Sequence, residues 1–369
     1  MDIGQRLKIA REAIGYTLKK ASQESEIGES SISEFENSKR EPKFSQLSRL
    51  AEVYRKTIEF FLSDKLLPSN IMLWCGQSGI EEETKETEAE FRQLCEQYHN
   101  LEVIMGEKRT SKLPQPDVSK PEEFNYKQAS LLAEKVLREF LLGDIPGMSL
   151  KQVLEEKYYV KIFHLDFLGS GISTKSQEFG PAILLNKRSK LWRRNFDLAH
   201  ELFHLLIWDV FRTGDPKDTG SSKAEEKLAV LFASRLLLPT DSVKQKIDSA
   251  IGQDGKVGLK ELDEIAREFG VSLDALLWRM LYLYNKSGED IEKYIEQAKG
   301  LKINRPLRQS DEPDKLPERY CSLAIRALNE GKLSLMRFAK FMDMSYKQAG
   351  EYLAEDEDFK DEKISISVT

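Results

Sequence analysis

Cysteine is scarce in this sequence of 369 residues, and long hydrophobic runs are missing. The three cysteines, Cys75, Cys95 and Cys321, lie far apart and form no CxxC pair. This spacing argues against a disulfide framework and against a cysteine zinc site, and it fits a reducing compartment. No apolar run approaches the ~18 residues of a membrane span. The charged N-terminal stretch also lacks the apolar core of a signal peptide. We therefore expect a cytoplasmic protein with no membrane partner.

A strong charge of one sign is missing as well. The net charge is −6, with 40% hydrophobic and 32% charged residues. This composition predicts a soluble globular protein that has room for two or three domains. It provides no overall attraction to nucleic acid, so that DNA binding would depend on a local surface.

Residues 1 to 64 predict five short helices. Thr17 is a good N-cap for the second helix, and Ala21 faces inward from it. Gly28 lies at a turn, and Pro42 follows the end of the third helix. Because a tight turn joins the second and third helices, the pattern is typical of a helix-turn-helix domain.

The segment LKKASQESEIGESSISEFENSKREPKFSQLSRLAEVY resembles the Cro/C1-type repressor helix-turn-helix, the XRE family. The resemblance implies double-stranded DNA as a partner, and it suggests a homodimer. It implies that bases are read by the exposed residues at the start of the third helix. The DNA-binding candidates are Glu29, Ser30, Ser31, Ser33, Lys39 and Arg40.

The charge of this segment departs from that expectation. Residues 1 to 64 contain eleven basic and eleven acidic side chains, and Glu29, Glu34 and Glu36 belong to the third helix itself. Carboxylates are repelled by phosphates, although one can accept a hydrogen bond from a cytosine amino group. The alternative is a helix-turn-helix scaffold that serves protein contact or dimerisation.

The pattern "HELFH" carries the clearest chemistry. Residues at i and i+4 of a helix share one face, so that His200 and His204 can direct two imidazoles at one metal ion. Glu201 lies alongside, where it can take a proton from the attacking water. The alternative is a buried helix with two core histidines, each of which would need a hydrogen-bond partner among apolar neighbours.

A zinc site of this kind needs a third protein ligand. His164, on a predicted strand, and His99, in the connector, are not excluded. The better candidates are Glu225 and Glu226, which open a strongly apolar helix downstream of His204. Periodicity alone does not decide between these two glutamates. Both could also be ordinary acids at a helix N-terminus, where the dipole favours them.

The segments EFGPAILLN, RRNFDLAHELFH and EEKLAVLFASRLLLP resemble, in order and spacing, the ImmA/IrrE-type metallopeptidases. The family pattern includes Arg193, Phe196 and Ala199 ahead of the HExxH motif. The resemblance implies a gluzincin-like zinc metallopeptidase with Zn²⁺ as its cofactor. It assigns the third metal ligand to Glu226 and the general base to Glu201.

Two residues depart from the family pattern. Phe203 replaces a small residue inside HExxH, and Val230 stands where the family has Asn. The resemblance implies cleavage of a partner repressor or antitoxin during a stress, phage or mobile-element response. The alternative is a non-catalytic transcriptional regulator, or a toxin–antitoxin or phage-defence component, whose zincin domain is a sensor or interaction module. Glu201 favours the protease, because a sensor needs the ligands but has no use for a general base.

The sequence thus predicts a multidomain protein. Its tail includes KLSLMRFAKFMDMSYKQAGEYL, which resembles another small helix-turn-helix. The expected parts are an all-α helix-turn-helix domain at 1–65, a helical connector with a Pro-containing linker at 66–119, an α+β zincin-like metallopeptidase domain with a small β-sheet at 120–305 and an α-helical C-terminal extension at 306–369.

Overall fold

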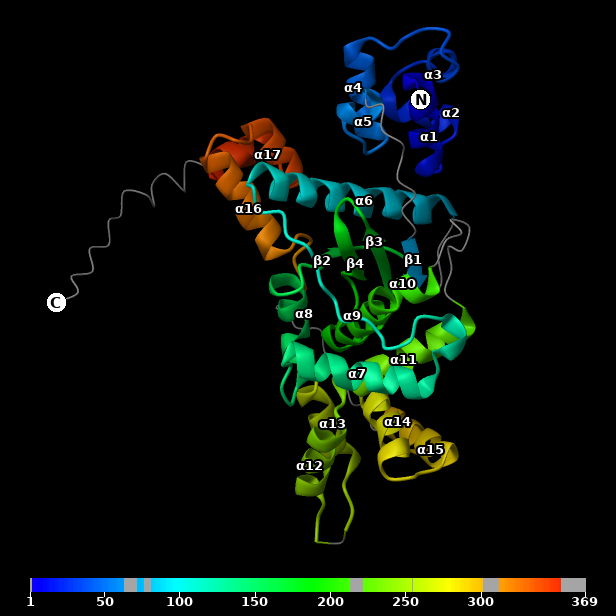
Figure 1. Cartoon of the computed structure of the whole chain (residues 1–369), viewed down its shortest axis with the longest axis vertical. Helices are drawn as coiled ribbons and strands as arrows, with labels where there is room; N and C mark the ends of the chain where they lie inside the picture. The colour runs from blue at the N-terminus through cyan, green and yellow to red at the C-terminus, as the bar shows by residue number, and fades with distance from the viewer. Residues whose placement is uncertain are drawn as a thin grey trace, which may run out of the picture. The chain divides into compact units, whose positions relative to one another are not determined.

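The computed structural model describes residues 2–62, 72–75, 81–212, 222–253, 255–300 and 312–352 (Figure 1). The chain divides into two compact units. The first comprises Met1–Gln93 and Thr110–Lys315, and the second comprises Leu94–Arg109 and Leu316–Thr369. Among the described residues, no helix has the length and apolar character needed to cross a membrane.

The N-terminal part of the first unit consists of five helices, as the sequence predicts. They are α1 (Ile3–Ala13), α2 (Leu18–Ser25), α3 (Glu29–Glu36), α4 (Phe44–Val53) and α5 (Ile58–Leu62). The Thr17 hydroxyl caps α2 by accepting a hydrogen bond from the Lys20 amide at 3.1 Å. The turn between α2 and α3 bends at Glu26, which has a φ of 55°. Gly28 is instead the residue that precedes α3, with a φ of −53°.

A four-stranded mixed sheet has the order β1-β3-β4-β2. Its strands are β1 (Met72–Cys75), β2 (Lys161–Leu165), β3 (Gly171–Ser176) and β4 (Gly180–Asn186). β3 is antiparallel to both β1 and β4, and β2 is parallel to β4. The multidomain α and α+β architecture expected from the sequence is confirmed, with this small sheet in the first unit.

The strand β1 corrects the prediction of a helical connector at 66–119. Met72–Cys75 pairs with β3 in the register Met72↔Thr174 to Cys75↔Gly171. Four residues are too few for a stable helix, and Met72 and Leu73 gain burial by joining the sheet. Leu73 is 1% exposed. The long helix expected in the same connector is present as α6 (Glu81–Ile104).

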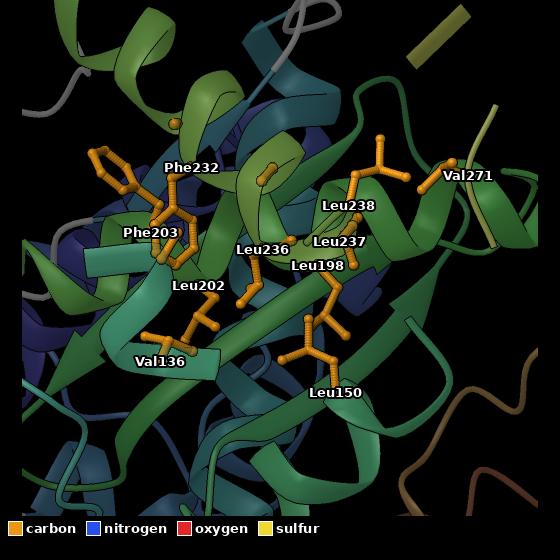
Figure 2. Packing of buried hydrophobic residues seen from close by; sticks show 14 of the residues in the cluster. Val136, Leu150, Leu198, Leu202, Phe203, Phe232, Leu236, Leu237, Leu238 and Val271 are labelled. Carbon is orange, nitrogen blue, oxygen red and sulfur yellow. The ribbon is translucent and has the colours of Figure 1, made fainter. Parts of the chain in front are cut away.

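Helices α7 (Tyr126–Phe140), α8 (Pro146–Glu156), α9 (Leu191–Leu206) and α11 (Lys223–Leu237) form the main core. α11 packs against both α7 and α9, and α9 also packs against β3 and β4. Figure 2 shows Phe203 and Leu202 of α9 next to Phe232 of α11 and Val136 of α7. The rings of Phe203 and Phe232 lie 5.4 Å apart, and both side chains are fully buried. This packing fixes α9 and α11, the two helices that carry the candidate metal ligands.

The remaining elements extend this core. In the first unit they are the 3₁₀ turn η1 (Pro121–Glu123) and the helices α10 (Trp208–Phe211), α12 (Thr240–Ala250), α13 (Leu259–Glu268), α14 (Leu273–Leu283) and α15 (Gly288–Gly300). The second unit contains α16 (Glu318–Asn329), α17 (Leu335–Phe341) and helical residues 346–352, together with the end of α6. The three helices expected in the C-terminal extension are therefore present.

Removal of the Phe232 ring should destabilise the core that holds both site helices. We expect Phe232→Ala to lower the free energy of unfolding by about 3–5 kcal/mol, because it removes buried apolar surface and leaves a cavity. Urea unfolding followed by circular dichroism measures this change. Val230→Ala on the same helix is the matched control, since Val230 is 48% exposed. We expect it to cost less than about 0.5 kcal/mol. Equal effects of the two substitutions would contradict this packing.

Candidate functional site

The centre of α9 brings the HExxH side chains to one buried location. His200 is 3% exposed, Glu201 is fully buried and His204 is 2% exposed. The two imidazole rings have their centroids 5.1 Å apart. The predicted i, i+4 geometry is therefore present in the folded chain.

Glu226, at the start of α11, completes a group of three that could hold a metal ion. Its Oε2 lies 3.1 Å from His200 Nε2, and its Oε1 lies 3.5 Å from His204 Nε2. One donor atom from each of the three residues lies within 4.8 Å of the others. Glu226 remains one-third exposed at its side chain, whereas both histidines are buried. The group therefore opens on the side of Glu226.

The other histidines considered from the sequence do not belong to this group. His164 lies on β2, where its Nδ1 is 3.1 Å from the Asp314 carbonyl oxygen. Burial lowers the pKa of His164 to about 3, so that this imidazole is neutral in the folded chain. His99 lies on α6 and is also outside the group. His164 is therefore a core histidine with a backbone partner.

Glu225 contacts the opposite side of the His204 ring from Glu226. Its Oε1 accepts hydrogen bonds from His204 Nδ1 at 2.9 Å and from Arg212 Nη2 at 2.7 Å. In the neutral ring with its proton on Nδ1, the Nε2 lone pair is available to a metal ion on the side of Glu226. A carboxylate that accepts from the second ring nitrogen fixes the tautomer and orientation of a metal-binding histidine. The two glutamates that the sequence could not separate thus have different environments.

The electrostatics of the two site histidines differ. Burial lowers the pKa of His200, and this effect outweighs the hydrogen bond to Glu226. Burial acts in the same direction on His204, but the hydrogen bonds to Glu225 and Glu226 outweigh it and raise the pKa to about 9. The histidine between the two carboxylates is therefore protonated when no metal is bound. A metal ion must displace this proton, so that metal affinity rises with pH.

The Glu201 carboxylate fits between α9 and β3 because Gly171 has no side chain. A Cβ at Gly171 would lie 2.6 Å from Glu201 Oε1 and 2.8 Å from its Cγ. These distances are shorter than any normal contact, so that a larger residue would displace the carboxylate. Gly171, which sequence analysis missed, therefore defines the position of Glu201.

A network beside the site ties α9 to the loop before β3. Arg193 Nε donates to Asp197 Oδ2 at 3.1 Å, and its Nη2 donates to Ser170 Oγ at 3.0 Å. Asn186 donates to the carbonyl oxygens of Phe167 and Gly169 at 2.7 and 2.9 Å. Arg193, which belongs to the family pattern, and Asn186 thus both hold this loop.

Asp197 adds a further buried carboxyl group one turn before Glu201. It is 1% exposed, and burial raises its pKa to about 6 against the opposing effect of Arg193. With Glu201 and Glu225 it makes a concentration of carboxyl groups that is unusual for a core. Buried acidic groups of this kind are normally paired with cations or coordinate metals.

Neither of the two departures from the family pattern belongs to the group of His200, His204 and Glu226. Phe203 is fully buried, and its ring packs edge-on against Phe124 at 5.8 Å. Val230, four residues after Glu226 on α11, is 48% exposed. Phe203 is thus a core residue, while Val230 lies on the exposed surface of α11.

The DNA-binding candidates lie at and after α3. Glu29, Ser30, Lys39 and Arg40 are exposed, whereas Ser31 and Ser33 are half-buried. The glutamates of α3 oppose DNA binding less than their number in the sequence suggests. Glu36 is buried and accepts two hydrogen bonds from Arg11, at 2.6 and 2.8 Å. Glu34 lies 3.6 Å from Arg40. Two of the three carboxylates of α3 therefore have a cationic partner within the domain.

Comparison with known proteins gives two domain matches. The family model described as IrrE N-terminal-like domain (peptidase M78) matches residues 155–281. The model described as Helix-turn-helix matches residues 7–61. β1 lies outside both matched ranges, so that the M78-matched part contributes the other three strands of the sheet.

Similarity to individual proteins is more limited. The HTH-type transcriptional regulator ImmR of Bacillus subtilis (strain 168) is 36% identical over 62 residues, which is 17% of this chain and 49% of that protein. The match thus spans about half of the relative. The crystal structure of Bacillus thuringiensis PlcR in complex with the peptide PapR7 and DNA aligns over 99% of both chains, at 14% identity and a TM-score of 0.17, which establishes no common fold. From the two family matches, the chain contains an XRE-type helix-turn-helix domain at residues 7–61 and an ImmA/IrrE-like peptidase M78 domain at residues 155–281.

Proposed function

We propose that this protein is a DNA-binding regulatory zinc metallopeptidase that cleaves a partner repressor or antitoxin protein. The observation that carries the proposal is the group of His200, His204 and Glu226, with Glu201 buried beside it. The match of residues 155–281 to the peptidase M78 family supports the reaction type. The helix-turn-helix match and the relative named a transcriptional regulator support a role at DNA.

The donor set fits zinc. Two imidazole nitrogens and one carboxylate are the protein ligands of many catalytic zinc sites, which keep a further position open for water or substrate. The Nε2 atoms of His200 and His204 and the Glu226 carboxylate would hold the ion. Bound zinc would lower the pKa of water and polarise the scissile carbonyl group.

Glu201 is the residue placed to move the proton. Its carboxylate would accept a proton from the attacking water and deliver it to the nitrogen of the departing amine. Because Glu201 is fully buried and held against Gly171, it has little freedom to leave this position. Because the base is already held where the reacting atoms would lie, proton transfer requires no rearrangement of the site.

The sheet edge near Glu201 supports a restricted choice of substrate. Many proteins bind extended peptides by adding them to a sheet edge. In the described structure, the outer side of β3 is paired with β1, and Cys75 lies opposite Gly171. An extended peptide cannot pair with this side of β3 while β1 remains there. This arrangement favours a protease that acts on a particular partner over a general digestive enzyme.

A second candidate function is a non-catalytic transcriptional regulator in which the metal domain is a sensor or an interaction module, as in a toxin–antitoxin or phage-defence system. The N-terminal similarity to the regulator ImmR favours it. Glu201 separates the two candidates, because a sensor requires the metal ligands but not the base.

Substitution of Glu201 tests the proposed reaction. We expect Glu201→Gln to retain zinc but to lose cleavage, because the amide cannot accept the proton. Each variant is co-expressed with proteins encoded at neighbouring loci, and mass spectrometry then searches for new protein termini. His204→Ala is the companion variant, and we expect it to lose both zinc and cleavage. If no new terminus is specific to the wild type, the proposed role of Glu201 is contradicted and the sensor function is favoured.

Substitution of Glu225 tests how His204 is oriented. We expect Glu225→Gln to weaken zinc binding by about 10–100-fold, because the neutral amide no longer provides a charged acceptor for His204 Nδ1. Competition with a chromophoric chelator measures the affinity. Glu264→Gln is the matched control, since Glu264 is an exposed residue of α13. Unchanged affinity in Glu225→Gln would show that this hydrogen bond does not contribute to the metal site.

A further inference from the structure

The C-terminal unit contains a second succession of helix, turn and helix. α17 begins after Ser334, whose hydroxyl accepts a hydrogen bond from a backbone amide of the first turn. The chain turns at Asp343, which has a φ of 56°. The helical residues 346–352 begin after Ser345, whose hydroxyl accepts from the Gln348 amide at 3.2 Å while its own amide donates to Gln348 Oε1 at 2.8 Å. This reciprocal cap fixes the start of the second helix.

The order of these elements corresponds to that of α2 and α3. There the left-handed residue of the turn is Glu26, with a φ of 55°. In the C-terminal unit, α17 buries Phe338 completely and leaves Ala339 5% exposed. The helical residues 346–352 contribute Ala349, which is also fully buried. Both segments thus have the local structure of a helix-turn-helix.

The C-terminal segment is held on a rigid base within its own unit. The buried Tyr320 hydroxyl is a hydrogen-bond donor to Gln97 Oε1 at 3.1 Å and to the Phe341 carbonyl oxygen at 3.0 Å. Arg319 donates to Glu102 Oε1 at 2.6 Å, which joins α16 to the end of α6. The position of α17 is therefore fixed by buried polar contacts as well as by apolar packing.

The exposed charged residues of this segment are three basic side chains and two acidic ones, Asp343 and Glu351. Arg337 and Lys340 of α17 and Lys347 of the following helix are exposed, and Tyr346 is 61% exposed. Lys347 lies 3.6 Å from Glu351, but exposed pairs of this kind are weak and leave the lysine available to a ligand. We call Arg337, Lys340, Tyr346 and Lys347 the C-terminal basic face.

The two helix-turn-helix segments differ in charge. Leu18 to Glu36 contains two lysines and five glutamates. Leu335 to Tyr352 contains three basic and two acidic residues. Attraction to phosphates provides most of the sequence-independent affinity for DNA. The formal charge of +1 in Leu335 to Tyr352 therefore suits a DNA backbone better than the −3 in Leu18 to Glu36, of which Glu36 is paired with Arg11 and Glu34 with Arg40.

We propose that the C-terminal basic face is a second binding surface for double-stranded DNA. Its arginine and lysines would neutralise phosphates, and the Tyr346 hydroxyl is a suitable donor to a phosphate oxygen. The proposal is independent of the metal site, and it adds a DNA contact to the one expected from α3. The ligand is identified by the charge and the helix-turn-helix arrangement of the surface.

The test uses the full-length protein and a fluorescein-labelled 30-base-pair duplex of random sequence. Fluorescence anisotropy gives the affinity over a range of salt concentrations for wild type and for Arg337→Gln/Lys340→Gln/Lys347→Gln. We expect the triple variant to bind at least about tenfold more weakly at low salt. We expect its salt dependence, the slope of log K against log salt, to fall by about 0.9 for each phosphate contact that is lost.

A control variant removes the same charge elsewhere. Lys244, Lys260 and Lys293 are exposed residues of α12, α13 and α15, and their triple substitution by Gln should leave the affinity and the slope close to wild type. Circular dichroism and zinc content confirm that both variants are folded. Lys39→Gln/Arg40→Gln reports the contribution of the N-terminal domain. Equal binding by the C-terminal triple variant and the control triple variant would overturn the proposal, whatever the effect at Lys39 and Arg40.

Discussion

The candidate site depends on the contact between His204 and the two glutamates that begin α11. Glu225 holds one ring nitrogen, and Glu226 faces the other. The contact requires α11 to pack against α9 at a fixed rotation, which the buried aromatic and aliphatic side chains between them provide. Because the same core orients both helices, the apolar packing and the chemistry of the site cannot be separated. A shift of one residue along α11 would move one glutamate into the place of the other and leave the second place without a carboxylate.

The surroundings of the site support the proposal of a selective protease. Buried carboxyl groups gather around the two histidines, and the loop before β3 is tied to α9 by Arg193. The strand β1, which lies outside the part matched by the peptidase family, covers the sheet edge near Glu201. Together with a helix-turn-helix domain in the same chain, these features suit a regulatory protease better than an unrestricted one.

Local rules predicted much of this structure, and long-range contacts account for what they missed. The HExxH helix, β2, β4 and the five N-terminal helices follow from periodicity and capping. β3 contains one large apolar residue, Ile172, and is a strand because it pairs on both sides. Arg212 follows α10 without any motif, so that its bond to Glu225 could not be foreseen. The family resemblance assigned the third metal ligand to Glu226 and not to Glu225. Their environments differ because of the rotation of α11 relative to α9, which periodicity within one helix does not predict.

X-ray absorption spectroscopy of the wild-type protein incubated with zinc tests the proposed metal site most directly. We expect one zinc ion per chain, with two imidazole nitrogens at about 2.0–2.1 Å and carboxylate or water oxygens in the remaining positions. A protein that binds no zinc, or a spectrum with sulfur or a third imidazole in the first shell, would contradict the assignment of His200, His204 and Glu226.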